Sequence, residues 1–156
     1  MTVGRTVGRT AQQLHSWWLT VEQRLAVDGE LTVTEDPADP GYRRFDLEAP
    51  GHGLATEASF RYEEWHERRR SRWVVAAYVY HSVDRLMGGE LGYHWHPLHR
   101  ADPAGRPVYH VVCRPSGGES GHYRSYHVSQ LEAHEALYRR YAAGERIDCS
   151  GLHPMW

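Results

Sequence analysis

The chain of 156 residues contains no lysine, so all 18 of its basic residues are arginines. This absence excludes Schiff-base chemistry on a lysine, the lysine of phosphate-binding loops and the lysine of common nuclease motifs. The net charge of -2 gives no broad electropositive field, so binding to duplex nucleic acid is not expected. The basic run HERRRSR at residues 66–72 is more typical of a solvated strand end or turn than of a nucleic-acid contact.

Cysteines and long apolar runs are also scarce. The two cysteines, Cys113 and Cys149, do not make a disulfide framework. We expect Cys113 to be a buried, unreactive thiol and Cys149 to lie in a loosely ordered tail. No apolar run approaches the ~20 residues needed to span a bilayer, and the N-terminal residues MTVGRTVGRTAQQ have no apolar signal region. We therefore expect a cytoplasmic protein in a reducing compartment, with no membrane contact.

The length predicts one domain, which we place at residues 10–146 between a tail at 1–9 and a tail at 147–156. Two capping boxes predict the starts of helices: Thr10 with Gln13, and Ser129 with Glu132. Apolar residues at helical spacing follow both boxes, which predicts helices at residues 11–27 and 130–143. Gly144 stands where a C-terminal cap belongs.

Between the two predicted helices, the apolar residues alternate with a period of two, which predicts strands. The segment at residues 72–83 is apolar on both faces and should lie at the centre of a sheet. The sequence therefore predicts an α+β fold: a single antiparallel meander sheet of five to seven strands, flanked by an N-terminal and a C-terminal helix.

Four histidines occur in GELGYHWHPLHRADPAGRPVYHVV, residues 89–112. The DPAG at 102–105 favours a type I turn followed by a left-handed Gly105, which would join two strands and place Leu98 opposite His110. In that hairpin one face carries His94, His96, His110 and Arg114. The other face is the more apolar and should be buried; it carries Tyr93, Trp95, Tyr109, Val111 and Cys113.

This clustering predicts a metal site or an acid–base site. Histidines two residues apart on a strand lie about 6.5–7 Å apart and can close on one ion, and imidazole suits zinc or iron. The predicted metal ligands are His94, His96, His110 and His134. The last of these lies on the inward stripe of the C-terminal helix and joins the site only if that helix packs over the histidines; a core histidine is the alternative interpretation.

The enzyme hypothesis is a hydrolase that acts on a phosphodiester or similar ester, in a small molecule or in single-stranded RNA. We expect His96 to be its most important residue, because it is central in the predicted cluster. The predicted catalytic residues are His96, His110, His127 and Arg124, and the predicted substrate-binding residues are Arg114, Trp95 and Tyr126.

Resemblances to known families are partial. GELGYHWHPLH has the spacing of the first cupin motif, but its glutamate is missing and no second motif follows. The order of elements over residues 73–143 resembles small TumE-like toxins of bacterial toxin–antitoxin pairs, which implies ribonuclease activity. The arginine–tyrosine–aspartate–asparagine run of that family is absent, so no residue role is carried over. Two alternatives stay open: a metal-dependent oxygenase or isomerase acting on a small molecule, and a non-catalytic binding or immunity-type protein with a protein partner.

Overall fold

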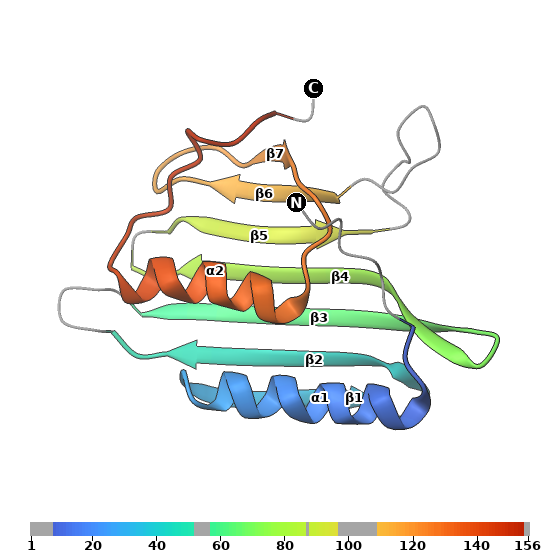
Figure 1. The fold of residues 1–156 in the computed structure, drawn as a ribbon. Helices are drawn as coiled ribbons and strands as arrows, with labels where there is room; N and C mark the ends of the chain where they lie inside the picture. The colour runs from blue at the N-terminus through green and yellow to red at the C-terminus, as the bar shows by residue number, and fades with distance from the viewer. Residues whose placement is uncertain (1–7, 52–56, 87, 97–108, 155–156) are drawn as a thin grey trace.

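The computed structural model describes residues 8–51, 57–86, 88–96 and 109–154. Its elements follow the chain as one helix, seven strands and a second helix (Figure 1). Their bounds are α1 (Ala11–Ala26), β1 (Glu30–Asp36), β2 (Asp39–Ala49), β3 (Ala58–Arg69), β4 (Arg72–Asp84), β5 (Glu90–Trp95), β6 (Tyr109–Arg114), β7 (Gly121–Arg124) and α2 (Gln130–Ala142).

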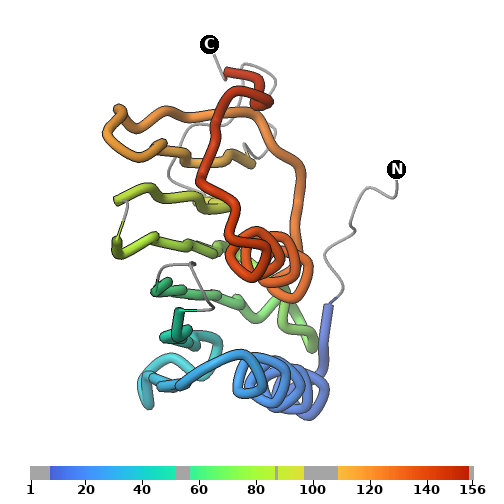
Figure 2. Tube along the Cα trace, turned by 90° about the vertical axis from the view of Figure 1, so that its left-hand side faces the viewer, coloured from blue at the N-terminus to red at the C-terminus, as the bar shows by residue number. Residues whose placement is uncertain are grey.

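The strands form one antiparallel sheet in the order β1 to β7, which confirms the predicted meander. The strand that is apolar on both faces, β4, is the central one. Both helices lie on the same face of the sheet, α1 near β1 and β2 and α2 near β4 (Figures 1 and 2). The opposite face carries no helix of the described residues.

The helix-covered face holds the core because the strands alternate apolar and polar residues. On β3, Ala58, Phe60 and Tyr62 point into the core, and on β4 Tyr78 and Tyr80 do the same. The helices contribute their apolar stripes, Leu14, Trp18, Val21 and Leu25 from α1 and Ala133, Leu137 and Tyr141 from α2. Burying one large apolar side chain of this kind stabilises the fold by about 1.5–3 kcal/mol.

Both predicted capping boxes are present. The Thr10 side chain accepts a hydrogen bond from the amide of Gln13, and the Ser129 side chain accepts one from the amide of Glu132. In return, the side chains of Gln13 and Glu132 accept a hydrogen bond from the backbone amides of Thr10 and Ser129. Gly144 has a φ of +68° and ends α2, as predicted.

The β5–β6 hairpin has a different register from the predicted one. His94 lies opposite His110, and Glu90 lies opposite Arg114. The sequence placed Leu98 opposite His110, so that prediction is wrong by four residues. Because the shift is even, every side chain keeps its face of the sheet. Leu98 and the turn at 102–105, Gly105 included, lie outside the described residues.

The C-terminal residues return to the sheet. A disulfide joins Cys113 of β6 to Cys149, with their Cα atoms 6.0 Å apart. Pro154 forms a bridge with Tyr123 of β7, and the Arg124 amide donates to the His153 carbonyl. The prediction of a buried Cys113 is confirmed, but the prediction that it is a free thiol is wrong. Within the described part of the chain, neither helix is long and apolar enough to cross a membrane.

Candidate functional site

The uncovered side of β4 to β7 carries five histidines, which we call the histidine face. They are His81 on β4, His94 on β5, His96 directly after β5, His110 on β6 and His122 on β7. The strand alternation places them there, because the residues between them, such as Tyr93 and Val111, fill the core side. The predicted assignment of His94, His96 and His110 to one face is therefore correct.

His94 is the central residue of this face. Its ring centroid lies 5.2 Å from that of His81, 5.6 Å from that of His96 and 5.4 Å from that of His110. His96 and His110 are 6.2 Å apart, so these two and His94 form a triangle of imidazoles. The sequence placed His96 at the centre because the predicted register set it diagonally across from His110. The actual register puts His94 directly opposite His110.

Gly92 makes the approach of His81 and His94 feasible. It lies opposite His81 on the neighbouring strand, between the two rings. A Cβ atom at position 92 would stand 2.9 Å from Nε2 of His94 and 3.0 Å from Cγ of His81, closer than real Cβ contacts. The missing side chain thus leaves the space in which the two imidazoles meet, with Nε2 of His94 3.3 Å from Nδ1 of His81.

A carboxylate and a guanidinium extend this pair into a series. Oε2 of Glu90 lies 3.6 Å from Nε2 of His81, and Oε1 of Glu90 lies 3.4 Å from Nε of Arg114. The order is therefore Arg114, Glu90, His81 and His94. Arg61 of β3, which lies opposite His81, adds a second positive charge beside that ring.

Electrostatics keep the central imidazoles neutral. Burial, together with the neighbouring His81 and His110 rings, which would repel a second positive charge, lowers the pKa of His94 to about 3. Burial also lowers the pKa of His81, while Glu90 acts in the opposite direction. At neutral pH His94 is therefore an uncharged imidazole, the form that accepts a proton or binds a metal ion.

The histidines do not form a ready ligand set as their side chains stand. Among the described residues, no group of three His, Cys, Asp or Glu side chains is arranged to hold a metal ion. His94 is instead engaged with His81. A metal ion on the triangle of His94, His96 and His110 would require the rings to turn towards one another.

Two predicted site residues lie on the other face of the sheet. His134 of α2 is 1% exposed, with Nδ1 2.7 Å from the Tyr62 hydroxyl and Nε2 2.7 Å from Oδ2 of Asp28. His127 contacts the rings of Tyr78 and Tyr109. Neither can reach the histidine face, so His134 is no ligand of the cluster, and the other interpretation of the sequence, a core histidine, is confirmed.

The remaining predicted residues are also dispersed. Trp95 packs against the core from the helix-covered side. Arg124 lies opposite His110 in the β6–β7 register and alternates with Tyr123 of the core side, so this predicted catalytic residue stands on the side of the histidine face. Tyr126 and part of Arg124 also line a cavity of about 210 Å³ bounded by Arg140 of α2 and by the C-terminal residues. Arg114 is the one predicted substrate-binding residue that lies beside the histidines. His99 lies outside the described residues.

The sequence reasoning missed His81, Glu90 and His122. The first two lie on strands that were predicted, and both alternate onto the polar side. The missing information was the pairing of β4 with β5, which sets His81 opposite Gly92. The sequence feature that could have indicated this contact is Gly92, which stands two residues before His94 and lies opposite His81.

No protein family, curated protein or solved structure in our comparisons matches this chain.

Proposed function

We propose that this protein is a small hydrolase, that the histidine face is its active site, and that it splits a phosphodiester or similar anionic ester by acid–base chemistry on histidine. The observation that carries the proposal is the contact between two neutral imidazoles, His94 and His81, with Glu90 behind them. A base oriented by a second group, which is itself oriented by a carboxylate, is the arrangement that activates water or a hydroxyl in many hydrolases.

The series gives each atom a role. In the tautomer that fits it, Nε2–H of His94 donates to Nδ1 of His81. Nε2 of His81 forms no hydrogen bond with a described residue and lies 3.6 Å from the Glu90 carboxylate, a distance at which the two interact as charges when His81 is protonated. Nδ1 of His94 then accepts a proton from the attacking water, while its Nε2 proton passes to His81. Glu90 stabilises the positive charge that develops on His81. The relay then runs in reverse, and the proton taken from water passes from His94 through the neighbouring His110 ring to the leaving alcohol, so that all the imidazoles end neutral.

The arginines supply the charge that an anionic substrate needs. Arg114 and Arg61 flank His81, and neither is buried. A guanidinium binds a phosphate or carboxylate group with two parallel hydrogen bonds. Their position favours an anionic ester, in a small molecule or in single-stranded RNA, as the substrate.

A metal-dependent version of the same hydrolase is the second candidate. Two imidazoles on one tetrahedral zinc ion have their bonded nitrogens about 3.3–3.4 Å apart, given a Zn–N distance of about 2.0–2.1 Å. The His94–His81 separation of 3.3 Å equals that spacing, but the two nitrogens form a hydrogen bond with each other, which the pair would have to give up to hold a metal ion. The triangle of His94, His96 and His110 offers three ligands and an open position, at which zinc or iron would activate water.

The test is hydrolysis of bis(p-nitrophenyl) phosphate and of a single-stranded RNA oligonucleotide by the full chain. We expect His94→Gln to lower kcat/KM by ~10²–10⁴ because it removes the base. His15→Gln, an exposed position on α1 far from the histidine face, is the matched control and should retain the activity.

Treatment with a chelator separates the two candidates. Activity that survives it supports the metal-free mechanism, and activity that is lost and then restored by zinc or iron supports the metal-dependent one. Full activity of His94→Gln, or no hydrolysis of either substrate with or without metal, would refute the proposed active site.

A further inference from the structure

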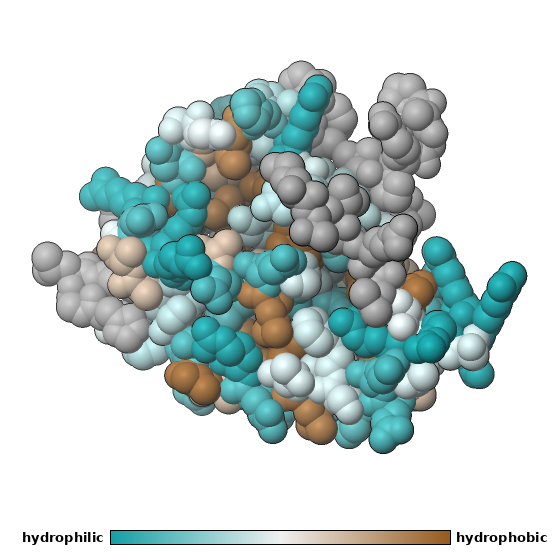
Figure 3. Space-filling model, in the orientation of Figure 1, coloured by the Kyte–Doolittle hydropathy of each residue, from teal (hydrophilic) through white to brown (hydrophobic). Residues whose placement is uncertain are grey.

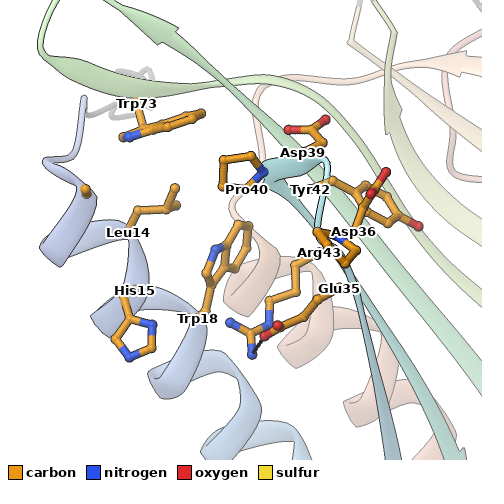
Figure 4. A pocket seen from close by; sticks show the side chains of 12 residues that line it. Leu14, His15, Trp18, Glu35, Asp36, Asp39, Pro40, Tyr42, Arg43 and Trp73 are labelled. Carbon is orange, nitrogen blue, oxygen red and sulfur yellow. Dashed lines mark ion pairs between the residues drawn. The ribbon is translucent and has the colours of Figure 1, made fainter.

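A second candidate site lies at the other end of the molecule. A cavity of about 400 Å³ separates α1 from the turn between β1 and β2 (Figure 4). Leu14 and Trp18 project from α1 towards Pro40, and Trp73 from the start of β4 lies at one end. The volume falls in the range of small-molecule sites, about 300–1,000 Å³.

The walls of this cavity are largely aromatic and apolar. Trp18, Trp73 and Tyr42 line it, together with Leu14 and Pro40. Trp18 is nearly fully buried and held against Phe45 and His66, so its ring is a fixed surface. A rigid aromatic wall favours a ligand with an apolar or flat body.

The rim is acidic. Glu35, Asp36 and Asp39 line the cavity with only one positive side chain that carries a fixed charge, Arg43. That guanidinium is already paired with Glu35 and with Glu22, and it lies 6.0 Å from the Trp18 ring. Asp36 and Asp39 form no ion pair with any described residue.

The two aspartates are nevertheless held in place. Oδ1 of Asp36 accepts from the Ala38 amide, and Oδ1 of Asp39 accepts from the Gly41 amide. Each carboxylate is therefore oriented by the turn while its negative charge stays unneutralised. Fixed carboxylates beside aromatic rings are the surroundings that attract an organic cation.

The same wall contains an unsatisfied donor. Arg43 is 8% exposed, and its Nε is buried without a hydrogen-bond partner among the described residues. An unpaired buried donor is costly. Because this atom is closed to solvent, a ligand in the cavity cannot reach it, and recognition rests on the two aspartates and the aromatic wall.

We propose that this cavity binds an organic ammonium ion with an aromatic or other apolar body, the chemistry of an amino-acid amide or of a peptide amino terminus. The ammonium group lies at Asp36 and Asp39, and the apolar body packs against Trp18 and Trp73. This site is separate from the histidine face and does not depend on hydrolysis.

Isothermal titration calorimetry on the full chain tests the proposal with matched probes. Phenylalanine amide carries the cation, the carbonyl and the aromatic body, whereas N-acetylphenylalanine amide has the same body without the charge. We expect the acetylated probe to bind about tenfold more weakly, and the affinity for phenylalanine amide to fall with added salt. The tripeptide Phe-Gly-Gly distinguishes the sources: tighter binding than the amide indicates a peptide amino terminus, and equal binding indicates a free amine.

Two variants locate the site. Asp39→Asn removes the charge but keeps the oxygen that accepts from Gly41, and Trp73→Leu removes an aromatic wall. Both should weaken binding, while Glu135→Gln, an exposed carboxylate on α2, should not. His94→Gln should also bind normally, which separates this site from the proposed active site. Equal binding of the charged and acetylated probes, no binding of either at millimolar concentration, or equal losses in Asp39→Asn and Glu135→Gln would overturn the proposal.

Discussion

At the scale of single residues, His94 links the site to the stability of the fold. Burial and the neighbouring imidazoles lower its pKa to about 3 in the folded protein, whereas a histidine in an unfolded chain titrates near 6.5. Between these values the unfolded chain binds a proton that the folded chain does not. The free energy of unfolding therefore decreases as the pH falls below about 6.5.

Replacement of His94 should make this pH dependence shallower. In His94→Gln the slope of the unfolding free energy against pH, between pH 6.5 and 4, should decrease by up to about 1.4 kcal/mol per pH unit. Urea unfolding at a series of pH values measures both slopes. Above pH 7 the histidine is neutral in both states, so there the two curves should run parallel. Parallel curves over the whole range would mean that His94 titrates normally in the folded protein.

At the scale of elements, local signals located the helices, but they did not locate the contacts between distant strands. Thr10 and Ser129 could be recognised as caps because each bonds to a residue three positions away. The hairpin register depends instead on the pairing of two strands that are separate in the sequence, and a turn signal at 102–105 was insufficient to set it. The face assignment survived because alternation along a strand is unchanged by an even shift.

The same alternation of side chains explains why His134 lies on the core side of the sheet and not on the histidine face. The sequence identified Tyr93, Trp95 and Tyr109 as the buried side of the hairpin, and a helix with an apolar stripe must cover that side. His134 lies on the stripe of α2, so it could not also meet histidines on the polar side. In the structure it joins three elements, because Tyr62 belongs to β3 and Asp28 to the turn after α1.

The His134 contacts should contribute substantially to stability. Replacement by alanine would leave a cavity in the core and would unpair the buried Tyr62 hydroxyl. We expect His134→Ala to lower the free energy of unfolding by about 2–4 kcal/mol, measured by urea unfolding at pH 7. Glu135→Ala, the exposed neighbour paired with Arg139, should change it by less than about 1 kcal/mol. Similar small losses in both variants would contradict the structural role of His134.

At the scale of the whole molecule, the disulfide attaches the C-terminal residues to the sheet. Cys113 lies at the core side of β6 and Cys149 lies after α2, so the bond closes a loop that contains β7 and α2. Together with the Tyr123–Pro154 bridge, it holds the C-terminal residues against β7. The expected cytoplasmic location rested on the missing apolar signal region and on unpaired cysteines, and stable disulfides are typical of oxidising compartments. The bond therefore removes the second of these two arguments for a reducing compartment.

Reduction of this bond should destabilise the protein. The two cysteines are 36 residues apart, and closing a loop of that size lowers the entropy of the unfolded chain enough to contribute about 2–4 kcal/mol. Urea unfolding with and without tris(2-carboxyethyl)phosphine should show a loss of that size. A double variant, Cys113→Ala with Cys149→Ala, should unfold identically in both conditions because it has no bond to reduce. Thiol titration of the native, never-reduced protein provides the decisive measurement: two free thiols after denaturation would show that the bond does not form and would restore the case for a reducing compartment.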